Sequence, residues 1–404
     1  MKDIIKNLAC SLFCTLSLFS CSEQFRHEPT GVQTAGLPLP VNQAQVKRNI
    51  PGGAVIGFDI KGNTNAAYIK AVFTGSDGAE RNVIVSSYVD TLTIRGLGNT
   101  DARTVRLYAV NRQEKTSSPV EVVINPLTPP VEQVFGSLKY AVDFGGFVID
   151  FGENVEKDDL AIHFIRKDST GSAFEPYDAL YTSLESGVFV VRDLPAVSNE
   201  FGLFIRDRWD NISDTLIFSA TPMREDYLNK KLFKRSYPAG DVMWNFFSGG
   251  AFERAYDDIV SNGNYAHTDY PVEFPHRYTL DLGVNVILSR FRLWQRPGST
   301  VLYQHGAPKY YKVYGRADDP GFGNAENVLE GWTLLRECTS FKPSGLPLGQ
   351  YSAEDEEYNG RGEEFSFPRD IQPIRYIRFE FLESWSGMKC SVVSELAFWG
   401  EIIQ

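Results

Sequence analysis

The sequence predicts an all-β protein with two tandem β-sandwiches followed by a larger β jelly-roll. The strand-like apolar runs are short, and turn residues separate them, in a chain with 34 glycines and 21 prolines. Helical periodicity is confined to residues 223–236 and 248–260, each long enough for one short helix. An internal repeat divides the first half of the chain, and the last third has a different texture.

The N-terminus has the layout of a bacterial lipoprotein signal. Two lysines precede a short apolar stretch, and the small residue Ser20 stands directly before Cys21. We therefore expect residues 1–20 to be a signal peptide and Cys21 to be acylated after cleavage. The alternative is an ordinary secretory signal followed by an incidental cysteine. Residues 21–31 are a polar tether, and the folded part should work outside the cytoplasm.

Charge and cysteine content exclude several classes of function. The chain has a net charge of −11, and loss of residues 1–20 removes two lysines and one aspartate, which leaves −12. This acidic balance argues against a nucleic-acid partner. No CxxC motif exists, which excludes zinc-ribbon and thioredoxin-like sites. For Cys338 and Cys390 the sequence allows either a disulfide or two buried free thiols.

The internal repeat predicts the two sandwiches. The motifs GGAVIGF (52–58), TLTIRGL (91–97) and VRLYAVNR (105–112) recur as GGFVIDF (145–151), VFVVRDL (188–194) and FGLFIRDR (201–208). Each copy then ends in a strand that runs into proline, so we assign residues 32–126 and 127–222 to two modules. Alternate residues such as Val105, Leu107 and Ala109 should face the core. The pattern resembles immunoglobulin-like and fibronectin type III-like sandwiches, which implies an architecture and not a ligand.

Residues 223–404 are assigned to a jelly-roll, because several strand candidates are joined by long connections. Six motifs stand in order: AYDD (255–258), YTLDLG (278–283), RFRLWQR (290–296), YYKVYG (310–315), RYIRF (375–379) and SELAFWG (394–400). They resemble the discoidin, or coagulation factor 5/8 C-type, domain and the related family 32 carbohydrate-binding modules, which share a galactose-binding-like fold. Asp257-Asp258 stands where the family has Asp-Gly, and residues 342–362 are an insertion with an acidic run, taken to be a solvated loop.

The layout as a whole is similar to Bacteroidetes lipoproteins encoded with polysaccharide-utilisation systems. This resemblance implies a cell-surface protein of the outer membrane that is held in the lipid through Cys21 and captures a polysaccharide or oligosaccharide. The alternative function is docking or scaffolding, with an outer-membrane transporter or other surface lipoproteins as partners. The alternative location is the periplasmic face of the same membrane.

The resemblance also implies a structural calcium ion. Discoidin-like modules hold calcium with backbone carbonyls, an early-loop aspartate and a glutamate near the last strand. The matching positions are Asp257, Asp258 and Glu395. Calcium needs six to eight oxygen ligands, which carbonyl-rich loops can supply. A turn-capping role for Asp257 and a strand-edge carboxylate at Glu395 are the alternatives.

Sugar recognition requires an aromatic face that covers the apolar side of a pyranose and planar polar groups for the hydroxyls. Loops at one end of a jelly-roll can supply both kinds of group. The candidates are Tyr265, His267, Arg296, Tyr303, His305 and Trp385. A core lid is the alternative role for Trp385, and a structural salt bridge is the alternative for Arg296.

The sequence lacks the common motifs of catalytic sites. The sequence has no HExxH, GxSxG, Walker or dinucleotide motif, and its five histidines show no metal-ligand spacing. A glycosidase needs only two carboxylates, but the three predicted domains leave no segment to house such a site. We therefore expect a binding protein and not an enzyme.

Overall fold

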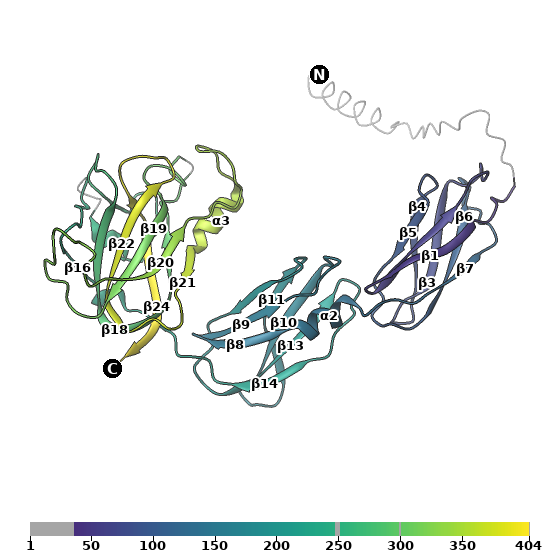
Figure 1. The fold of residues 1–404 in the computed structure, drawn as a ribbon, viewed down its shortest axis with the longest axis horizontal. Coiled ribbons are helices and arrows are strands. Elements are labelled where there is room, and N and C mark those ends of the chain that lie inside the picture. Colours follow the sequence, from purple (N-terminus) through teal and green to yellow (C-terminus); the bar gives the residue numbers. More distant parts are fainter. Residues whose placement is uncertain (1–35, 247–250, 299, 404) are drawn as a thin grey trace, which may run out of the picture. The chain divides into compact units, whose positions relative to one another are not determined.

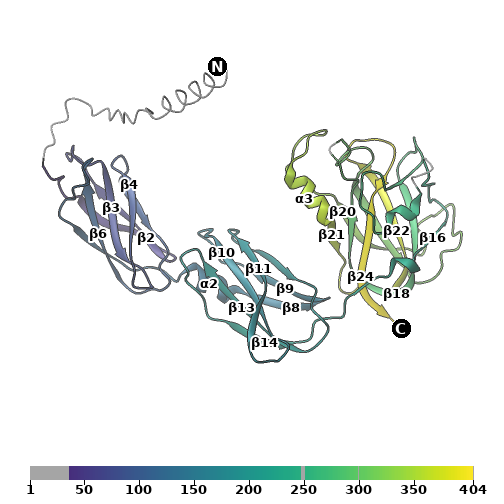
Figure 2. The ribbon, with the colours of Figure 1, turned by 180° about the vertical axis from the view of Figure 1, so that it is seen from behind.

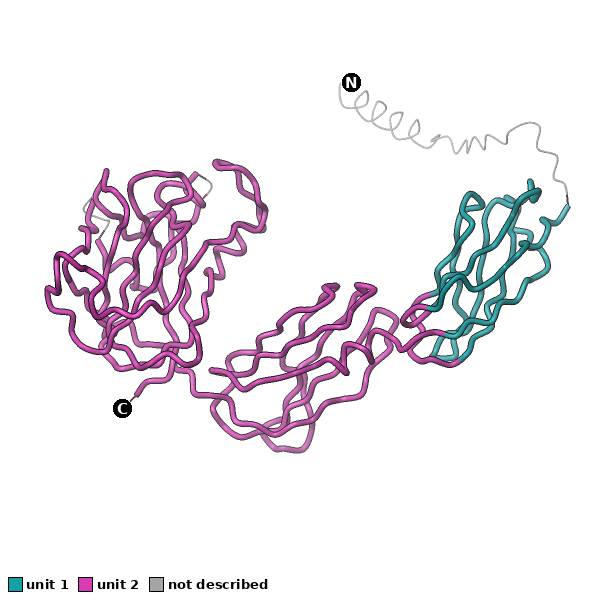
Figure 3. Tube along the Cα trace, viewed as in Figure 1, with its two compact units in different colours: residues 1–49, 54–94, 102–125 teal, residues 50–53, 95–101, 126–404 magenta. Residues whose placement is uncertain are grey.

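The computed structural model describes residues 36–246, 251–298 and 300–403, and strands dominate it (Figure 1). This confirms the all-β prediction. Contacts divide the chain into two compact units: residues 1–49, 54–94 and 102–125, and residues 50–53, 95–101 and 126–404 (Figure 3). The predicted signal peptide, Cys21 and the tether lie outside the described residues. Within the described ranges, no helix has the length and apolar character needed to cross a membrane.

The first sandwich has two sheets with strand orders β1-β2-β5 and β4-β3-β6-β7. Its strands are β1 (Asn42–Ile50), β2 (Gly53–Asp59), β3 (Tyr68–Thr74), β4 (Glu80–Ser86), β5 (Thr91–Ile94), β6 (Arg103–Val110) and β7 (Val120–Ile124). Val105, Leu107 and Ala109 of β6 are fully buried, as the alternation predicts. Arg106, which alternates with them, points outward and pairs with Glu80.

The second sandwich has sheets with strand orders β12-β9-β8 and β11-β10-β13-β14. It consists of α2 (Pro130–Ser137), β8 (Lys139–Asp143), β9 (Gly146–Phe151), β10 (Leu160–Lys167), β11 (Phe174–Thr182), β12 (Gly187–Val191), β13 (Asn199–Asp207) and β14 (Leu216–Ala220). Four phenylalanines from four strands form the centre of its core: Phe147, Phe164, Phe201 and Phe218. This core is apolar throughout, and its aromatic rings pack edge to face or tilted.

The repeat is visible in the backbone hydrogen bonds at the start of each module. Gly52 and Gly145 both adopt a left-handed conformation, with φ of 60° and 61°. The Gly52 N–H donates to Leu127 O, and the Gly145 N–H donates to Met223 O. The entry and the exit of each repeated segment are therefore hydrogen-bonded to one another.

The jelly-roll is built around a sheet of eight strands among the described residues, ordered β15-β24-β18-β22-β19-β20, with β16 and β21 also paired to β18. A second, two-stranded sheet joins β17 and β23. The elements are β15 (Asp226–Tyr227), η1 (Lys230–Leu232), β16 (Lys234–Ser236), η2 (Phe252–Ala255), β17 (Ala266–His267), β18 (His276–Trp294), β19 (Pro308–Arg316), β20 (Thr333–Thr339), α3 (Ala353–Arg361), β21 (Glu363–Ser366), β22 (Ile374–Ser384), β23 (Val392–Val393) and β24 (Glu395–Ile403).

The long strand β18 bends at Gly283, whose φ is 76°. Before the bend β18 pairs with β16 and β22, and after it β18 pairs with β21 and β24. A side chain at position 283 would meet the backbone of Leu232, so only glycine fits this bend. One strand thereby pairs with four others of the same sheet: β16, β21, β22 and β24.

The two predicted helices are wrong. Residues 223–236 form β15, η1 and β16, because strand pairing with β24 and β18 overrides a weak helical pattern. The described part of 248–260 holds only the short η2. The acidic run predicted to be a solvated loop is instead α3, which begins at a capping box of Ser352 and Asp355. Helix α3 lies beside β21 in the two opposite views of the ribbon (Figure 1 and Figure 2).

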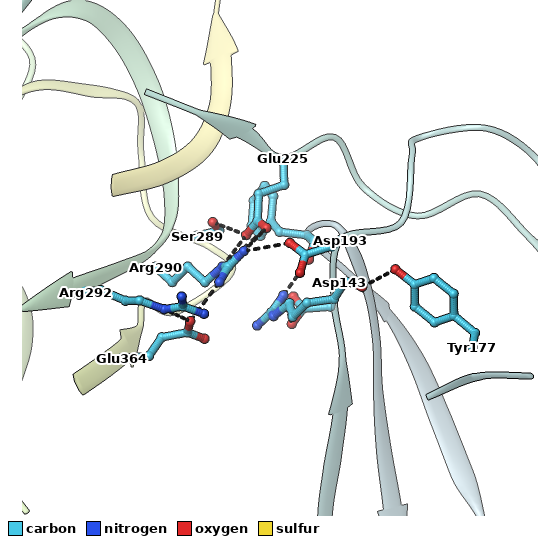
Figure 4. A network of polar contacts seen from close by, with 10 residues as sticks. Asp143, Tyr177, Asp193, Glu225, Ser289, Arg290, Arg292 and Glu364 are labelled. Carbon is cyan, nitrogen blue, oxygen red and sulfur yellow. Dashed lines mark hydrogen bonds and ion pairs between the residues drawn. The ribbon is translucent and has the colours of Figure 1, made fainter. Parts of the chain in front are cut away.

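Arg290 of β18 is the centre of a polar network in the second unit (Figure 4). Its guanidinium is 2% exposed and binds Glu225 at 2.8 Å, Glu364 at 2.7 Å and Asp193 at 3.3 Å. The same group lies 4.4 Å from the centre of the Trp399 ring. Glu225 also accepts a hydrogen bond from Ser289. These contacts fix the segment that leads from the second sandwich into β15.

Cys338 and Cys390 are both buried free thiols. The structure therefore decides between the two alternatives that the sequence left open, and the disulfide is not formed. Burial raises the pKa of the Cys390 thiol to about 11. Such a thiol is protonated at neutral pH and unreactive.

Candidate functional site

Backbone hydrogen bonds bring together three loops that carry predicted site residues. His267 of β17 pairs with Val392 of β23, and the Val392 N–H donates to Gly306 O at 2.9 Å. The Trp385 N–H donates to Ala307 O, also at 2.9 Å. We call this region, residues 246, 259–272, 295–298, 300–307 and 384–394, the loop end of the jelly-roll. The predicted sugar-binding residues all lie in it.

Aromatic side chains form a ledge on one part of the loop end. We define the aromatic ledge as Phe246, Tyr265, His267, Tyr270 and Arg296. The rings of Phe246 and His267 stack with centroids 4.8 Å apart and planes at 22°. Phe246 is 48% exposed, and its ring meets that of Tyr270 edge-on at 6.1 Å. The Arg296 guanidinium lies 3.9 Å from the centre of the Tyr265 ring.

The protonation of His267 and the hydrogen bonding of Arg296 determine the polar character of the ledge. Burial lowers the pKa of His267, so its imidazole is neutral at pH 7. Its Nδ1 lies 2.5 Å from Thr268 O, and because a carbonyl oxygen only accepts, Nδ1 carries the hydrogen. Arg296 Nε donates to Asn262 O at 2.9 Å, which holds the guanidinium over Tyr265. The alternative predicted for Arg296, a structural salt bridge, is not the contact observed at this residue.

A hollow of about 340 Å³ opens beside Arg296. It is lined by Val260, Pro297, Gly298, Leu302, Glu356, Asn359 and Gly360. Its volume is at the small end of the range for ligand pockets. It joins the loop end to α3, an element that the sequence did not predict.

The other predicted sugar-binding residues form a second group. Tyr303 is buried and donates its hydroxyl to Phe341 O at 3.1 Å, and burial raises its pKa. The Tyr303 ring meets that of half-buried Trp385 edge-on at 5.3 Å. Tyr303 therefore packs against Trp385 inside the domain. Because it is buried, it cannot contact a ligand, and this corrects its predicted role in sugar binding. His305 is exposed.

The three carboxylates predicted to bind calcium do not all meet at one position. Asp257 accepts hydrogen bonds from Asn264 at 2.9 Å and from the Ile259 N–H, so it caps a turn. Asp258 and Glu395 both bind the Lys230 ammonium, at 2.7 Å each. Within the described residues, no cluster of three or more His, Cys, Asp or Glu side chains could hold a metal ion. The donor set therefore does not fit a divalent cation.

Burial opposes the charge of Lys230, but hydrogen bonds to Asp258 and Glu395 outweigh burial and raise its pKa. Burial raises the pKa of Glu395, and the lysine works against that rise. The hydrogen bond from Lys230 lowers the pKa of Asp258. The alternative role predicted for Glu395, a carboxylate at the edge of a strand, agrees with its position at the start of β24. It did not include the ion pair with Lys230.

The second sandwich carries a further hollow, of about 540 Å³, that sequence reasoning missed. It is lined by Asp159, Leu160, Ala161, His163, Tyr181, Thr182, Ser183, Arg206, Asp207, Arg208 and Asp210. The His163 ring stacks on Phe204 at 4.7 Å, and Tyr181 is 77% exposed on the edge strand β11. A sequence signal for this hollow was available. The alternation of side chains along β10, β11 and β13 places the aromatic rings of His163, Tyr181 and Phe204 on the outer face of the sheet.

Phe246 was also missed as a site residue, because it follows the core residue Trp244 closely in sequence. Trp244 is 1% exposed and belongs to the jelly-roll core. Two positions later, the side chain turns outward onto His267, a residue 21 positions away. Local sequence gives no sign of that stacking.

Comparisons with family models match three successive segments of the chain. Three family models match, each described as a domain of unknown function: DUF4959 over residues 38–126, DUF5126 over 127–231 and DUF5000 over 252–400. The comparison with curated proteins gave no match.

Among solved structures, a SusE-like protein, BT2857, is 33% identical, with 68% of this chain and 100% of that chain covered and a TM-score of 0.44. A putative chitobiase fragment from Bacteroides thetaiotaomicron is 20% identical, covering 44% of this chain and 95% of that chain with a TM-score of 0.31. A GH31 CBM32-2 module, solved bound to GalNAc, is 13% identical, covering 41% and 95% with a TM-score of 0.28. At this identity and coverage of the first of these structures, the chain belongs to the SusE-like family.

Proposed function

We propose that the protein is a non-catalytic, glycan-binding lipoprotein of the outer membrane. It is anchored through acylated Cys21 and captures a polysaccharide or oligosaccharide at the cell surface. The ligand binds at the loop end of the jelly-roll. Membership of the SusE-like family and the lipoprotein layout of the N-terminus support this proposal.

The aromatic ledge is the observation that carries the proposal. A sugar ring has an apolar face of C–H groups, and an exposed, flat aromatic surface can cover it. Phe246 is 48% exposed and is backed by the stacked His267 ring, so its ring can offer such a surface. Arg296 lies at its edge and supplies planar N–H donors for hydroxyl groups.

The hollow beside Arg296 gives the site room for a second part of the ligand. Glu356 of α3 brings a polar group to its wall, and Val260 and Leu302 bring apolar ones. A ligand that stacks on the ledge and reaches past Arg296 would contact both regions. Because the ledge is shallow, each site should bind with modest affinity, and capture should depend on several sites along one polymer.

The test is binding of the chain from Ser22 onward to a panel of plant, host and microbial polysaccharides. Phe246→Ala and Arg296→Ala should each weaken binding at least tenfold without a change in the unfolding midpoint. Trp385→Ala and His305→Ala probe the other group of predicted residues in the same loop end.

Phe322→Ala is the matched control. Phe322 is 72% exposed, and it lies in the loop after β19, at the opposite end of that strand from the loop end. The control should bind like the unmodified chain. Binding that Phe246→Ala and Arg296→Ala leave intact would rule out the ledge as the site.

A second candidate function is docking of another protein. The observation in its favour is the edge strand β12, where Val188 and Val190 are 55% and 41% exposed. Exposed edge strands pair readily with another chain. In this case Val188→Lys should abolish co-purification with an outer-membrane transporter or other surface lipoproteins and leave glycan binding unchanged.

A further inference from the structure

Lys230 brings together three parts of the jelly-roll that are far apart in sequence. It belongs to η1, its Nζ lies 2.7 Å from Asp258 Oδ1, and it lies 2.7 Å from Glu395 Oε1. Asp258 follows η2, and Glu395 begins β24. The lysine therefore joins a loop to the last strand of the sheet.

Lys230 and Glu395 are shielded from solvent, whereas the side chain of Asp258 is 69% exposed. The side chain of Lys230 is 6% exposed and that of Glu395 is 2% exposed. An ammonium group loses its hydration on such burial, which costs several kcal/mol unless carboxylates replace the water. Two carboxylates do so here, and the Tyr227 ring lies 5.8 Å from Nζ. The Tyr227 hydroxyl in turn donates to Asp258 at 3.3 Å.

The same carboxylates are those that the discoidin resemblance assigns to calcium. Asp258 and Glu395 direct an oxygen at the ammonium, and Asp257 is engaged by Asn264. An ion with six to eight oxygen ligands does not fit a position already held by a lysine. The charge of the lysine serves the purpose that a metal would serve, because it compensates the two carboxylates and holds their segments together.

We propose that Lys230 is the built-in cation of this jelly-roll and takes the place of a structural calcium ion. The fold and its loop end are then stable without any divalent metal. Glu395 Oε2 has no hydrogen-bond partner among the described residues, so Lys230 is its main source of compensating charge. Loss of the lysine alone would leave a buried carboxylate unpaired.

The first measurement is the thermal unfolding of the chain from Ser22 onward in EDTA and in millimolar calcium. The two midpoints should agree within the error of the method, and calcium titration calorimetry should give no heat. A midpoint that EDTA lowers or calcium raises would overturn the proposal. This measurement needs no variant, so it holds even if substitutions at Lys230 prevent folding.

The second measurement compares Lys230→Met with Lys231→Met. Lys231 is the exposed neighbour in the same short helix, so its substitution changes the net charge equally. Lys230→Met should lower the midpoint by roughly 5–10 °C, and Lys231→Met should not. The double variant Lys230→Met/Glu395→Gln should regain part of the loss. A Lys230→Met midpoint equal to that of Lys231→Met would also overturn the proposal.

Discussion

The second sandwich and the jelly-roll are stabilised by different kinds of buried contact. The core of the second sandwich is a cluster of phenylalanines and aliphatic residues. Its ion pairs lie outside that core, some at the surface, such as Arg206 with Asp210, and one largely shielded from water, Arg192 with Asp143. In the described part of the chain, each lysine or arginine that is buried belongs to the jelly-roll: Lys230, Arg290, Lys342 and Arg378.

This difference follows from the connections between strands. The sandwich has short turns whose backbone groups bond to each other or to a nearby side chain, as at Asp207. The jelly-roll has long loops, whose carbonyl groups need donors that the local backbone does not supply. Buried cations supply them: Arg378 donates to Ala239 O at 2.6 Å, and Lys342 donates to Gln350 O at 2.6 Å. Charge in the jelly-roll is therefore a means of ordering loops.

The largest effect should come from Arg378→Met. Arg378 is fully buried, pairs with Asp241 at 2.7 Å and also donates to Ala239 O and Val328 O. Its loss leaves a buried carboxylate and two carbonyl groups unpaired, so we expect a loss of about 4–5 kcal/mol in unfolding free energy. Urea unfolding of the jelly-roll signal measures it.

The double variant Arg378→Met/Asp241→Leu sharpens this prediction. Replacing both partners removes the unpaired charge, so most of the lost stability should return. If the double variant is as unstable as Arg378→Met, the carbonyl contacts carry the effect and the charge does not.

A somewhat smaller effect is expected from Leu203→Ala in the second sandwich. Leu203 is fully buried on β13, and its truncation removes apolar contact and leaves a cavity, which costs about 3–4 kcal/mol. Hydrogen exchange should show faster opening in residues 127–222 and unchanged protection of β18. Loss of protection in β18 would mean that the two regions unfold as one, and the comparison would fail.

The jelly-roll should lose stability as the pH rises through the range in which Glu363 titrates. Burial raises the pKa of Glu363 from 4.5 to about 7, so between these values the folded chain binds more protons than the unfolded chain. Stability therefore falls as pH rises from about 4.5 to 7, by about 2–3 kcal/mol. Urea midpoints at several pH values measure this slope, and Glu363→Gln should flatten it. An unchanged slope in that variant would assign it to another group.

The smallest effect is expected at an exposed pair of the first sandwich. Arg106 and Glu80 lie 2.7 Å apart, but their side chains are largely exposed to water. Arg106→Ala should cost less than about 1 kcal/mol, and added salt should reduce even that. A loss as large as that of Arg378→Met would show that surface pairs stabilise the sandwiches as buried ones stabilise the jelly-roll.

The sequence predicted the parts of the fold that depend on local pattern. The motifs around Gly52 and Gly145 identified the same backbone turn in both modules, and alternation placed Leu107 in the core. Helix α3 was not predicted, because its acidic residues suit a solvated loop equally well. Its capping box at Ser352 and Asp355 was the available signal.

The contents of the candidate site were less predictable, because its contacts join residues far apart in the chain. The loop residues around His267 and Trp385 were found from their chemistry, but Phe246 was not, since its stacking on His267 depends on the fold. Likewise Asp258 and Glu395 were recognised as partners of a cation. That the cation is Lys230, 165 positions before Glu395, could not be read from spacing.

The paired hydrogen bonds at Gly52 and Gly145 also bear on how this chain arose. A segment whose entry and exit are joined can be copied in tandem without leaving an open end in its neighbour. Duplication then needs no new joint, since each copy brings its own glycine and its own closing strand. The number of sandwiches that precede the jelly-roll is thus a quantity that gene duplication can change in whole steps, while the jelly-roll itself is left intact.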